Sequence, residues 1–223
     1  MAGSTLEGEV RRLVEIRASE LVGFQDVKTA ENYIRFVQRV WDAERAVTSE
    51  TRFSEAVARY LYKLTAYKDE YEVARLLTAP GFAEAATAEV PGSGRVAFQL
   101  HPPMLRALGR QKKMAFGPRS HRMLRVLATL KRLRGTPFDV FGYTHVRRLE
   151  RALVAHYREV LTGLAESLSP QSYQRAVRVA SLPDLIRGFE GVKLATITTY
   201  RDCLAAEGID EGQLGRLPRR QDS

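Results

Sequence analysis

Apolar residues recur along most of this chain at steps of three and four, the spacing that places them on one face of an α-helix. The pattern predicts helices over residues 5–19, 29–46, 54–77, 118–133, 144–168, 170–181 and 183–208, with a short one ending at residue 89. On the second of these, the inner face is expected to carry Tyr33, Phe36, Val37, Val40 and Trp41.

The helical pattern is interrupted once, at Pro91-Gly92-Ser93-Gly94. Residues 95–100 then alternate between apolar and polar side chains, as a short strand does, and residues 113–116 offer a pairing partner. No internal repeat or long linker divides the chain. We therefore expect an all-α fold, with about eight helices in a single bundle-like domain over residues 1–215, a small β-hairpin near residues 95–117 and a disordered tail over residues 216–223.

The helix expected over residues 54–77 is dense in tyrosine and charge. Its apolar stripe holds Val57, Tyr60, Leu64, Tyr67, Tyr71 and Ala74. Lys63 and Glu70 lie two turns apart at the edge of that stripe. Because a buried polar group without a partner costs about 1–3 kcal/mol, this helix is expected to carry a polar network with partners elsewhere in the chain. Whether that network is a site or a scaffold stays open.

The composition is that of a globular protein, with 44% hydrophobic and 27% charged residues, and it allows a sizeable core without disulfides. The single cysteine, Cys203, excludes a disulfide framework and a cysteine-rich iron–sulfur site. No stretch approaches the roughly 18 apolar residues of a membrane span, and the N-terminus lacks a secretion pattern. We therefore expect a cytoplasmic protein that does not bind membranes.

The net charge of +9 is concentrated in one region. Residues 106–151 hold 13 Lys and Arg against two acids, Asp139 and Glu150. A solvated basic face, a docking surface for an acidic protein or anion, and nucleic-acid binding all stay open, the last ranked lowest because no zinc-finger, RNP or helix-turn-helix signature is present. Four of the arginines, Arg122, Arg125, Arg132 and Arg134, share one predicted helix with apolar residues that are expected to face a core: Met123, Leu124, Val126, Leu127, Leu130 and Leu133.

Motifs for enzyme chemistry are missing. The sequence holds no phosphate-cradling glycine loop, no thiamine diphosphate signature and no nucleophile elbow. His145 and His156 are eleven residues apart, about 16 Å along a helix, too far to share a metal, so no metal site is expected. His101 precedes two prolines that fix the backbone, and either a binding or acid–base role or a structural role fits it.

Several segments resemble the C-terminal domain of fused indolepyruvate ferredoxin oxidoreductases. They are residues 63–76 (KLTAYKDEYEVARL), 133–139 (LRGTPFD), 141–144 (FGYT), 147–151 (RRLER), 186–189 (IRGF) and 192–193 (VK). They follow the family's order with similar spacing, and the resemblance extends over about residues 15–201. Those large 2-oxoacid oxidoreductases join a thiamine diphosphate unit, iron–sulfur centres and this helical region in one polypeptide.

The chain also departs from that family. Glu190, Gly191 and Leu194 stand where the family reads Gly-His after the Phe and then an acidic residue, and Val140 replaces a proline. The cofactor-bearing parts do not occur in this sequence, so the resemblance implies that thiamine diphosphate and iron–sulfur clusters belong to partner domains. An excised domain, a separate subunit and a relative with another function all stay open.

Joined to this resemblance, the polar residues at the helix ends suggest a pocket for an aryl carboxylate or another anion. The residues expected to line it are Lys63, Tyr67, Glu70, Tyr71, His101, Arg134, Tyr143, Arg148, Arg187 and Lys193. Arg148 is expected to pair with Glu70, and Lys63 or Arg187 with a carboxylate, in a buried cluster. The alternative role of such a cluster is to specify helix packing.

Two functions follow as expectations. The first is an accessory or interaction module of a 2-oxoacid:ferredoxin oxidoreductase, without a redox cofactor of its own, that binds a cofactor-bearing subunit or ferredoxin. The second is a free-standing enzyme acting on an aromatic acid. In that case the acid–base candidates are Glu70, His101, Tyr67 and Lys63.

Overall fold

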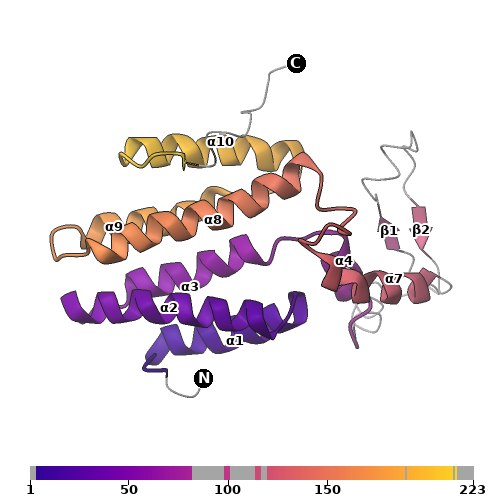
Figure 1. Ribbon diagram of the computed structural model, residues 1–223, viewed down its shortest axis with the longest axis horizontal. Helices are drawn as coiled ribbons and strands as arrows, with labels where there is room; N and C mark the ends of the chain where they lie inside the picture. Colours follow the sequence, from indigo (N-terminus) through magenta and orange to yellow (C-terminus); the bar gives the residue numbers. More distant parts are fainter. Residues whose placement is uncertain are drawn as a thin grey trace, which may run out of the picture. The chain divides into compact units, whose positions relative to one another are not determined.

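The computed structural model describes residues 4–81, 98–100, 114–116, 120–188, 190–212 and 214. The described part contains eight α-helices, two 3₁₀ segments and one pair of three-residue strands (Figure 1). The prediction of an all-α fold is thereby confirmed. None of the helices in these ranges combines the length and the apolar character needed to cross a bilayer.

The contacts of the chain divide it into two compact units. Unit 1 comprises Met1–Tyr67 with Gly142–Ser223, and unit 2 comprises Lys68–Phe141. The hydrophobic pattern alone does not predict this division, because it runs without a linker signal through both boundaries. The tail expected over residues 216–223 lies outside the described residues.

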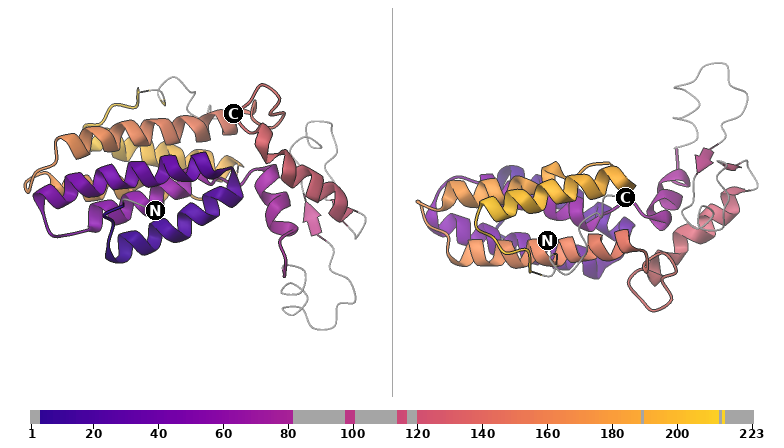
Figure 2. Two further views of the ribbon diagram at one scale, coloured as in Figure 1. Left: turned by 60° about the horizontal axis from the view of Figure 1, so that its bottom comes forward. Right: turned by 90° about the horizontal axis from the view of Figure 1, so that it is seen from above.

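Unit 1 is a bundle of helices that run side by side in the views of Figures 1 and 2. Its elements are α1 (Gly8–Phe24), α2 (Val27–Val47), α3 (Arg52–Thr65), α8 (His145–Glu166), α9 (Tyr173–Ser181), the 3₁₀ segment η2 (Leu182–Leu185) and α10 (Glu190–Ala206). Helix α3 packs against α1, α2, α8 and α9, so it occupies the middle of the bundle. The inner face predicted for α2 is confirmed, because all five of its residues are buried.

A buried carboxylate joins three helices of unit 1. Glu44 of α2 is fully buried and accepts hydrogen bonds from the backbone amides of Phe53 and Ser54 at 2.9 and 2.8 Å, and from the Ser54 hydroxyl. The hydroxyl of Tyr173, on α9, donates to the same carboxylate at 2.7 Å. Glu44 thus satisfies amides at the start of α3 that would otherwise lack an acceptor, and it links α3 to α9.

Unit 2 is smaller and also mainly helical. It contains α4 (Glu70–Leu77), β1 (Phe98–Leu100), β2 (Met114–Phe116), α7 (Ser120–Thr129) and the 3₁₀ segment η1 (Leu130–Leu133). Helices α4 and α7 pack against each other. The two strands pair antiparallel, with Phe98 opposite Phe116, and the rest of the hairpin expected near residues 95–117 lies outside the described residues.

The prediction of one continuous helix over residues 54–77 is wrong. Helix α3 ends at Thr65 and α4 begins at Glu70. Asp69 has an extended backbone, with φ −99° and ψ −177°, and its side chain accepts a hydrogen bond from the amide of Glu72 at 2.8 Å. Asp69 is therefore an N-cap, which starts a new helix at a point where the apolar period alone predicts continuation. The break places Tyr67 in unit 1 and Tyr71 in unit 2.

The last predicted helix is also divided, into η2 and α10. A third correction concerns α7, whose apolar residues were expected to face a core. Leu124 is buried, but Met123, Val126 and Leu130 are 55%, 60% and 40% exposed. In the described part of the chain, one apolar face of this helix packs on α4 while the other meets solvent.

Candidate functional site

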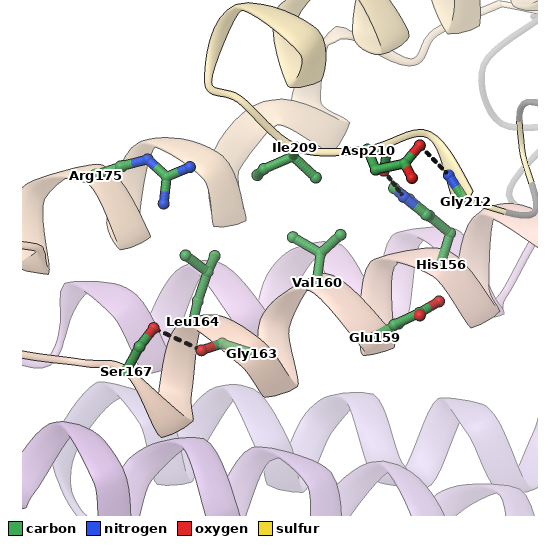
Figure 3. A pocket seen from close by; sticks show the side chains of 10 residues that line it. All are labelled: His156, Glu159, Val160, Gly163, Leu164, Ser167, Arg175, Ile209, Asp210 and Gly212. Atoms are coloured by element: carbon green, nitrogen blue, oxygen red, sulfur yellow. Dashed lines mark hydrogen bonds between the residues drawn. The ribbon is translucent and has the colours of Figure 1, made fainter.

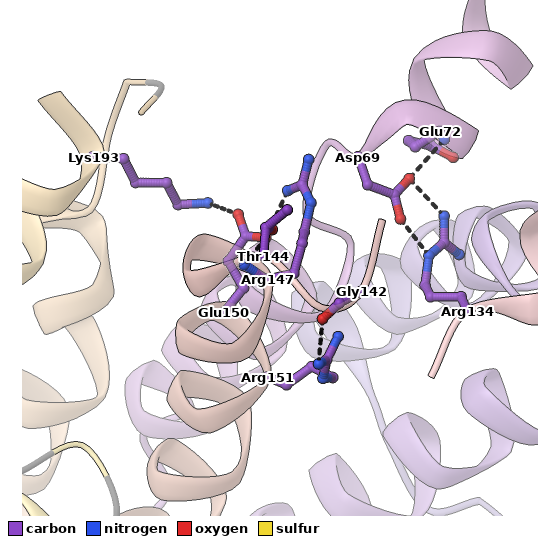
Figure 4. Close-up of polar contacts among 9 residues, drawn as sticks. All are labelled: Asp69, Glu72, Arg134, Gly142, Thr144, Arg147, Glu150, Arg151 and Lys193. Atoms are coloured by element: carbon purple, nitrogen blue, oxygen red, sulfur yellow. Dashed lines mark hydrogen bonds and ion pairs between the residues drawn. The ribbon is translucent and has the colours of Figure 1, made fainter. Parts of the chain in front are cut away.

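The α8 cluster comprises Thr144, Arg147, Glu150 and Lys193, which Figure 4 draws, together with Tyr67, and all five residues belong to unit 1. Thr144 caps α8, and its hydroxyl accepts from the amide of Arg147 at 3.4 Å. Glu150 lies in the second turn of α8 and is only 3% exposed. Its carboxylate accepts from Nη1 of Arg147 at 2.6 Å and from Nζ of Lys193, which lies in the first turn of α10. The ion pair between Lys193 and Glu150 thus joins the start of α10 to the start of α8, whereas the pair of Arg147 with Glu150 lies within α8.

Tyr67 contacts this cluster through Arg147. The guanidinium carbon of Arg147 lies 5.5 Å from the centre of the Tyr67 ring, a cation–π distance. The Tyr67 ring is buried and packs edge-on against Phe24, with 5.7 Å between the ring centres. Tyr67 therefore holds a cation of the cluster in place, and its own ring is covered on two sides.

A second group of charges in unit 1 centres on Asp184. Nζ of Lys63 donates to the carbonyls of Pro183 and Asp184 at 3.0 and 3.2 Å and lies 3.6 Å from the Asp184 carboxylate. Nη2 of Arg187 donates to that carboxylate at 2.8 Å. Burial lowers the pKa of Lys63, and the charge of Asp184 opposes this shift. Lys63 and Arg187 thus find the carboxylate that was expected, but at the surface, since the Asp184 side chain is 51% exposed.

Positive charge is in excess at these two groups. Together with the first two turns of α8, the two groups hold the cations Lys63, Arg147, Arg148, Arg151, Arg187 and Lys193, and the carboxylates Glu150 and Asp184. Arg151 donates to the carbonyl of Gly142 at 2.7 Å, whereas Arg148 and Tyr143 are exposed. This part of unit 1 is therefore electropositive, with one aromatic side chain at the surface beside the start of α8.

The α4 cluster comprises Asp69, Tyr71, Arg134, Gly135 and Asp139, all in unit 2 (Figure 4 draws Asp69, Glu72 and Arg134). Arg134 donates to both carboxylate oxygens of Asp69, at 2.6 and 2.8 Å. Asp139 accepts from the Tyr71 hydroxyl at 3.2 Å and from the amide of Gly135 at 2.9 Å. Gly135 has φ +77°, a left-handed conformation that favours glycine, so this residue suits the turn that brings Asp139 back towards α4.

The predicted site residues fall into both units. Unit 1 holds Lys63, Tyr67, Tyr143, Arg148, Arg187 and Lys193, unit 2 holds Glu70, Tyr71 and Arg134, and His101 lies outside the described residues. The expected pair of Arg148 with Glu70 would join the two units and stays a prediction. Asp69 and Asp184 were missed, although Asp69 is followed three residues later by Glu72, the spacing of a capping box.

A cavity of about 340 Å³ lies elsewhere in unit 1, between α8, α9 and the segment after α10 (Figure 3). His156 and Asp210 meet at its edge, where Nε2 of His156 lies 2.8 Å from the Asp210 carbonyl oxygen. Val160, Leu164 and Ile209 supply apolar walls. Of the predicted site residues that the structure describes, none lines this cavity.

Chemically, both clusters consist of carboxylates that accept from cations, amides or a phenol. Such groups can fix helices and can present surplus cations to an anion. Within the described ranges, no three His, Cys, Asp or Glu side chains gather as a metal site would require.

Comparison with known proteins places most of this chain in one family. Residues 10–206 match the model of a family of unknown function, DUF6537. The chain belongs to this family. No curated protein and no solved structure is significantly similar to it. The DUF6537 match includes every residue of the α8 and α4 clusters, so both are parts of the family's region.

Proposed function

We propose that this DUF6537 chain is an accessory or interaction module of a 2-oxoacid:ferredoxin oxidoreductase of the indolepyruvate type. In this role it carries no redox cofactor, and the thiamine diphosphate and iron–sulfur clusters belong to partner domains or subunits in the cytoplasm.

The observation that supports the proposal is that the segments resembling those enzymes contact one another within each unit. Asp69, from residues 63–76, binds Arg134, from residues 133–139. Lys193, from residues 192–193, binds Glu150, from residues 147–151. A chance similarity spread over distant segments gives no reason for those segments to meet through buried ion pairs. A shared domain architecture does give one.

The surplus of cations near the start of α8 supports a further part of the proposal, an anionic ligand with an aromatic group. Arg148 and Arg187 are exposed and can bind a carboxylate through their planar guanidinium groups. Tyr67 is covered by Arg147 and Phe24, so stacking on a ligand falls to Tyr143, which is 63% exposed.

A reconstitution experiment tests the function. The purified chain is mixed with the cofactor-bearing subunit of an indolepyruvate ferredoxin oxidoreductase, and complex formation is followed by analytical ultracentrifugation. We expect a stoichiometric complex and faster 2-oxoacid-dependent reduction of ferredoxin than with the subunit alone. The isolated chain is expected to be colourless, without absorbance near 400 nm from bound iron–sulfur clusters.

Two results would contradict the proposal. One is the absence of any complex at micromolar concentrations. The other is turnover of aryl 2-oxoacids by the chain alone, which would favour an enzyme in its own right.

A further inference from the structure

Helix α7 and the 3₁₀ segment η1 are apolar on two faces. Leu124, which is 4% exposed, lies on the buried face of a helix that packs against α4. Met123, Val126 and Leu130 are spaced by three and four residues, so they form a second stripe, and each of them is at least 40% exposed. We call Met123, Val126 and Leu130 the α7 stripe.

Three neighbouring apolar side chains that are all exposed on one helical stripe are unusual on a protein surface. A helix with apolar residues all round is ordinarily buried on all sides, and exposed apolar patches rimmed by polar residues mark interaction sites. Within the described part of the chain, α7 packs on α4, and the three residues of the α7 stripe stay exposed beside that contact. Phe138 and Val140, in the same unit, are also exposed, by 73% and 62%.

The charges around the α7 stripe indicate the kind of partner. Residues 120–138 contain no Asp or Glu, and the first acid after them, Asp139, is buried against Tyr71 and Gly135. Arg122, Arg125 and Arg132 are exposed between and beside the apolar residues. The field at this face is therefore positive, and it attracts a surface rich in carboxylates.

We propose that the exposed face of α7 and η1 docks an acidic protein of the ferredoxin class, whose carboxylates meet the arginines while its apolar side chains cover the α7 stripe. The inference rests on the proposed function, which supplies the class of acidic partner. A second copy of this chain is disfavoured, because it would bring the same arginines together. Single-stranded nucleic acid is disfavoured because its sites interleave basic residues with aromatic side chains for stacking, whereas this stripe consists of Met, Val and Leu.

Surface plasmon resonance of the full chain over immobilised ferredoxin tests the proposal. We expect binding whose association rate falls steeply as salt rises from about 0.1 to 1 M, where the Debye length shrinks from about 10 to 3 Å. Reversing Arg122 and Arg132 together to glutamate should weaken binding by about tenfold or more. The matched control reverses Lys28 and Arg35, two exposed cations of α2, which changes the net charge equally and should leave most of the binding.

The apolar contribution is tested separately. Val126→Ser should raise the dissociation rate several-fold with little change in the salt dependence, because it removes covered apolar area and no charge. Val22→Ser, at a 41% exposed valine of α1, is the control and should bind like the wild type. Met123→Ser provides a second variant of the α7 stripe. Far-UV circular dichroism checks that each variant keeps its helical fold.

Three outcomes would overturn the docking proposal. They are no salt-sensitive binding to ferredoxin, equal binding by the α7 variants and their controls, and tighter binding to a mixed DNA duplex than to ferredoxin. If the chain forms a complex with the cofactor-bearing subunit but fails these tests, the proposed function stands and only the docking surface is wrong. If both fail, the proposed function falls as well.

Discussion

Arg134 and Asp69 form a bidentate ion pair, in which Nε of Arg134 donates to Oδ2 of Asp69 at 2.6 Å and Nη2 donates to Oδ1 at 2.8 Å. The two side chains are 6% and 3% exposed. The same Oδ1 atom accepts from the amide of Glu72 and caps α4. One carboxylate therefore both starts a helix and binds the arginine that begins the turn at Gly135.

We predict that Asp69→Ala destabilises unit 2 by about 3–5 kcal/mol, because it leaves the Arg134 guanidinium buried without its carboxylate and removes a helix cap. Amide hydrogen exchange of α4 measures this loss locally. Asp184→Ala is the control, and because its ion pairs are exposed, its cost should stay below about 1 kcal/mol.

Adding Arg134→Met to Asp69→Ala should recover part of the loss, since the unpaired charge is then gone. Equal exchange rates in α4 for Asp69→Ala and Asp184→Ala would contradict this account of the pair. Glu70, which the sequence favoured for this role, is partly exposed, so its truncation should cost less than that of Asp69.

In unit 1, we predict that Glu150→Gln destabilises the bundle by about 3–5 kcal/mol, because Arg147 and Lys193 then share no buried anion. Urea unfolding followed by the fluorescence of Trp41, which belongs to unit 1, measures the change. Glu159→Gln, at an exposed position of the same helix, should shift the free energy of unfolding by about 0.5 kcal/mol or less. If Glu150→Gln lowers the free energy of unfolding no more than Glu159→Gln does, the ion pairs of Glu150 do not stabilise the bundle and the prediction is wrong.

Stability should fall at alkaline pH because of buried tyrosines. Burial raises the pKa of Tyr33, Tyr157 and Tyr200, and burial together with Asp139 raises that of Tyr71. A group whose pKa is higher in the folded state stabilises the fold fully below its unfolded pKa, about 10 for tyrosine, and less as pH rises above it.

The midpoint of thermal unfolding should therefore stay level up to about pH 10 and drop above it. Tyr157, whose hydroxyl donates to the Ala180 carbonyl at 2.6 Å, gives the sharpest test. Tyr157→Phe should flatten part of the alkaline drop, whereas Tyr143→Phe, at an exposed tyrosine, should leave it unchanged. A spectroscopic titration in which all nine tyrosines ionise near pH 10 in the folded chain would contradict the prediction.

The sequence predicts the helical class and the buried face of α2 because both depend on one local signal, the period of the apolar residues. It does not predict the break before α4, since Tyr67 and Tyr71 keep the helical period across it while a single side chain, Asp69, decides where the new helix starts. In α7, the apolar pattern predicts Met123 and Val126 as core residues, although both are exposed. Residue type alone does not distinguish an apolar face that packs against another helix from one that meets solvent. The residues predicted for one candidate site lie in two units for a related reason. The boundary between the units falls between Tyr67 and Lys68, inside the segment that the apolar period predicts as one helix.

The electropositive part of unit 1 should bind an aromatic carboxylate. We predict that phenylpyruvate raises the midpoint of thermal unfolding, by about 5–10 °C at concentrations about 100-fold above its dissociation constant, because a ligand bound only by the folded state stabilises it by about 2.7 kcal/mol there. Tryptamine, which offers an aromatic ring with a positive charge, should give no rise.

Replacing Arg148 and Arg187 together with glutamine should remove the effect of phenylpyruvate, while the unliganded midpoint changes little because both side chains are exposed. Replacing Lys28 and Arg35 with glutamine is the matched control and should preserve the effect. A rise of equal size with tryptamine, or one that survives the loss of Arg148 and Arg187, would show that these cations do not hold the carboxylate.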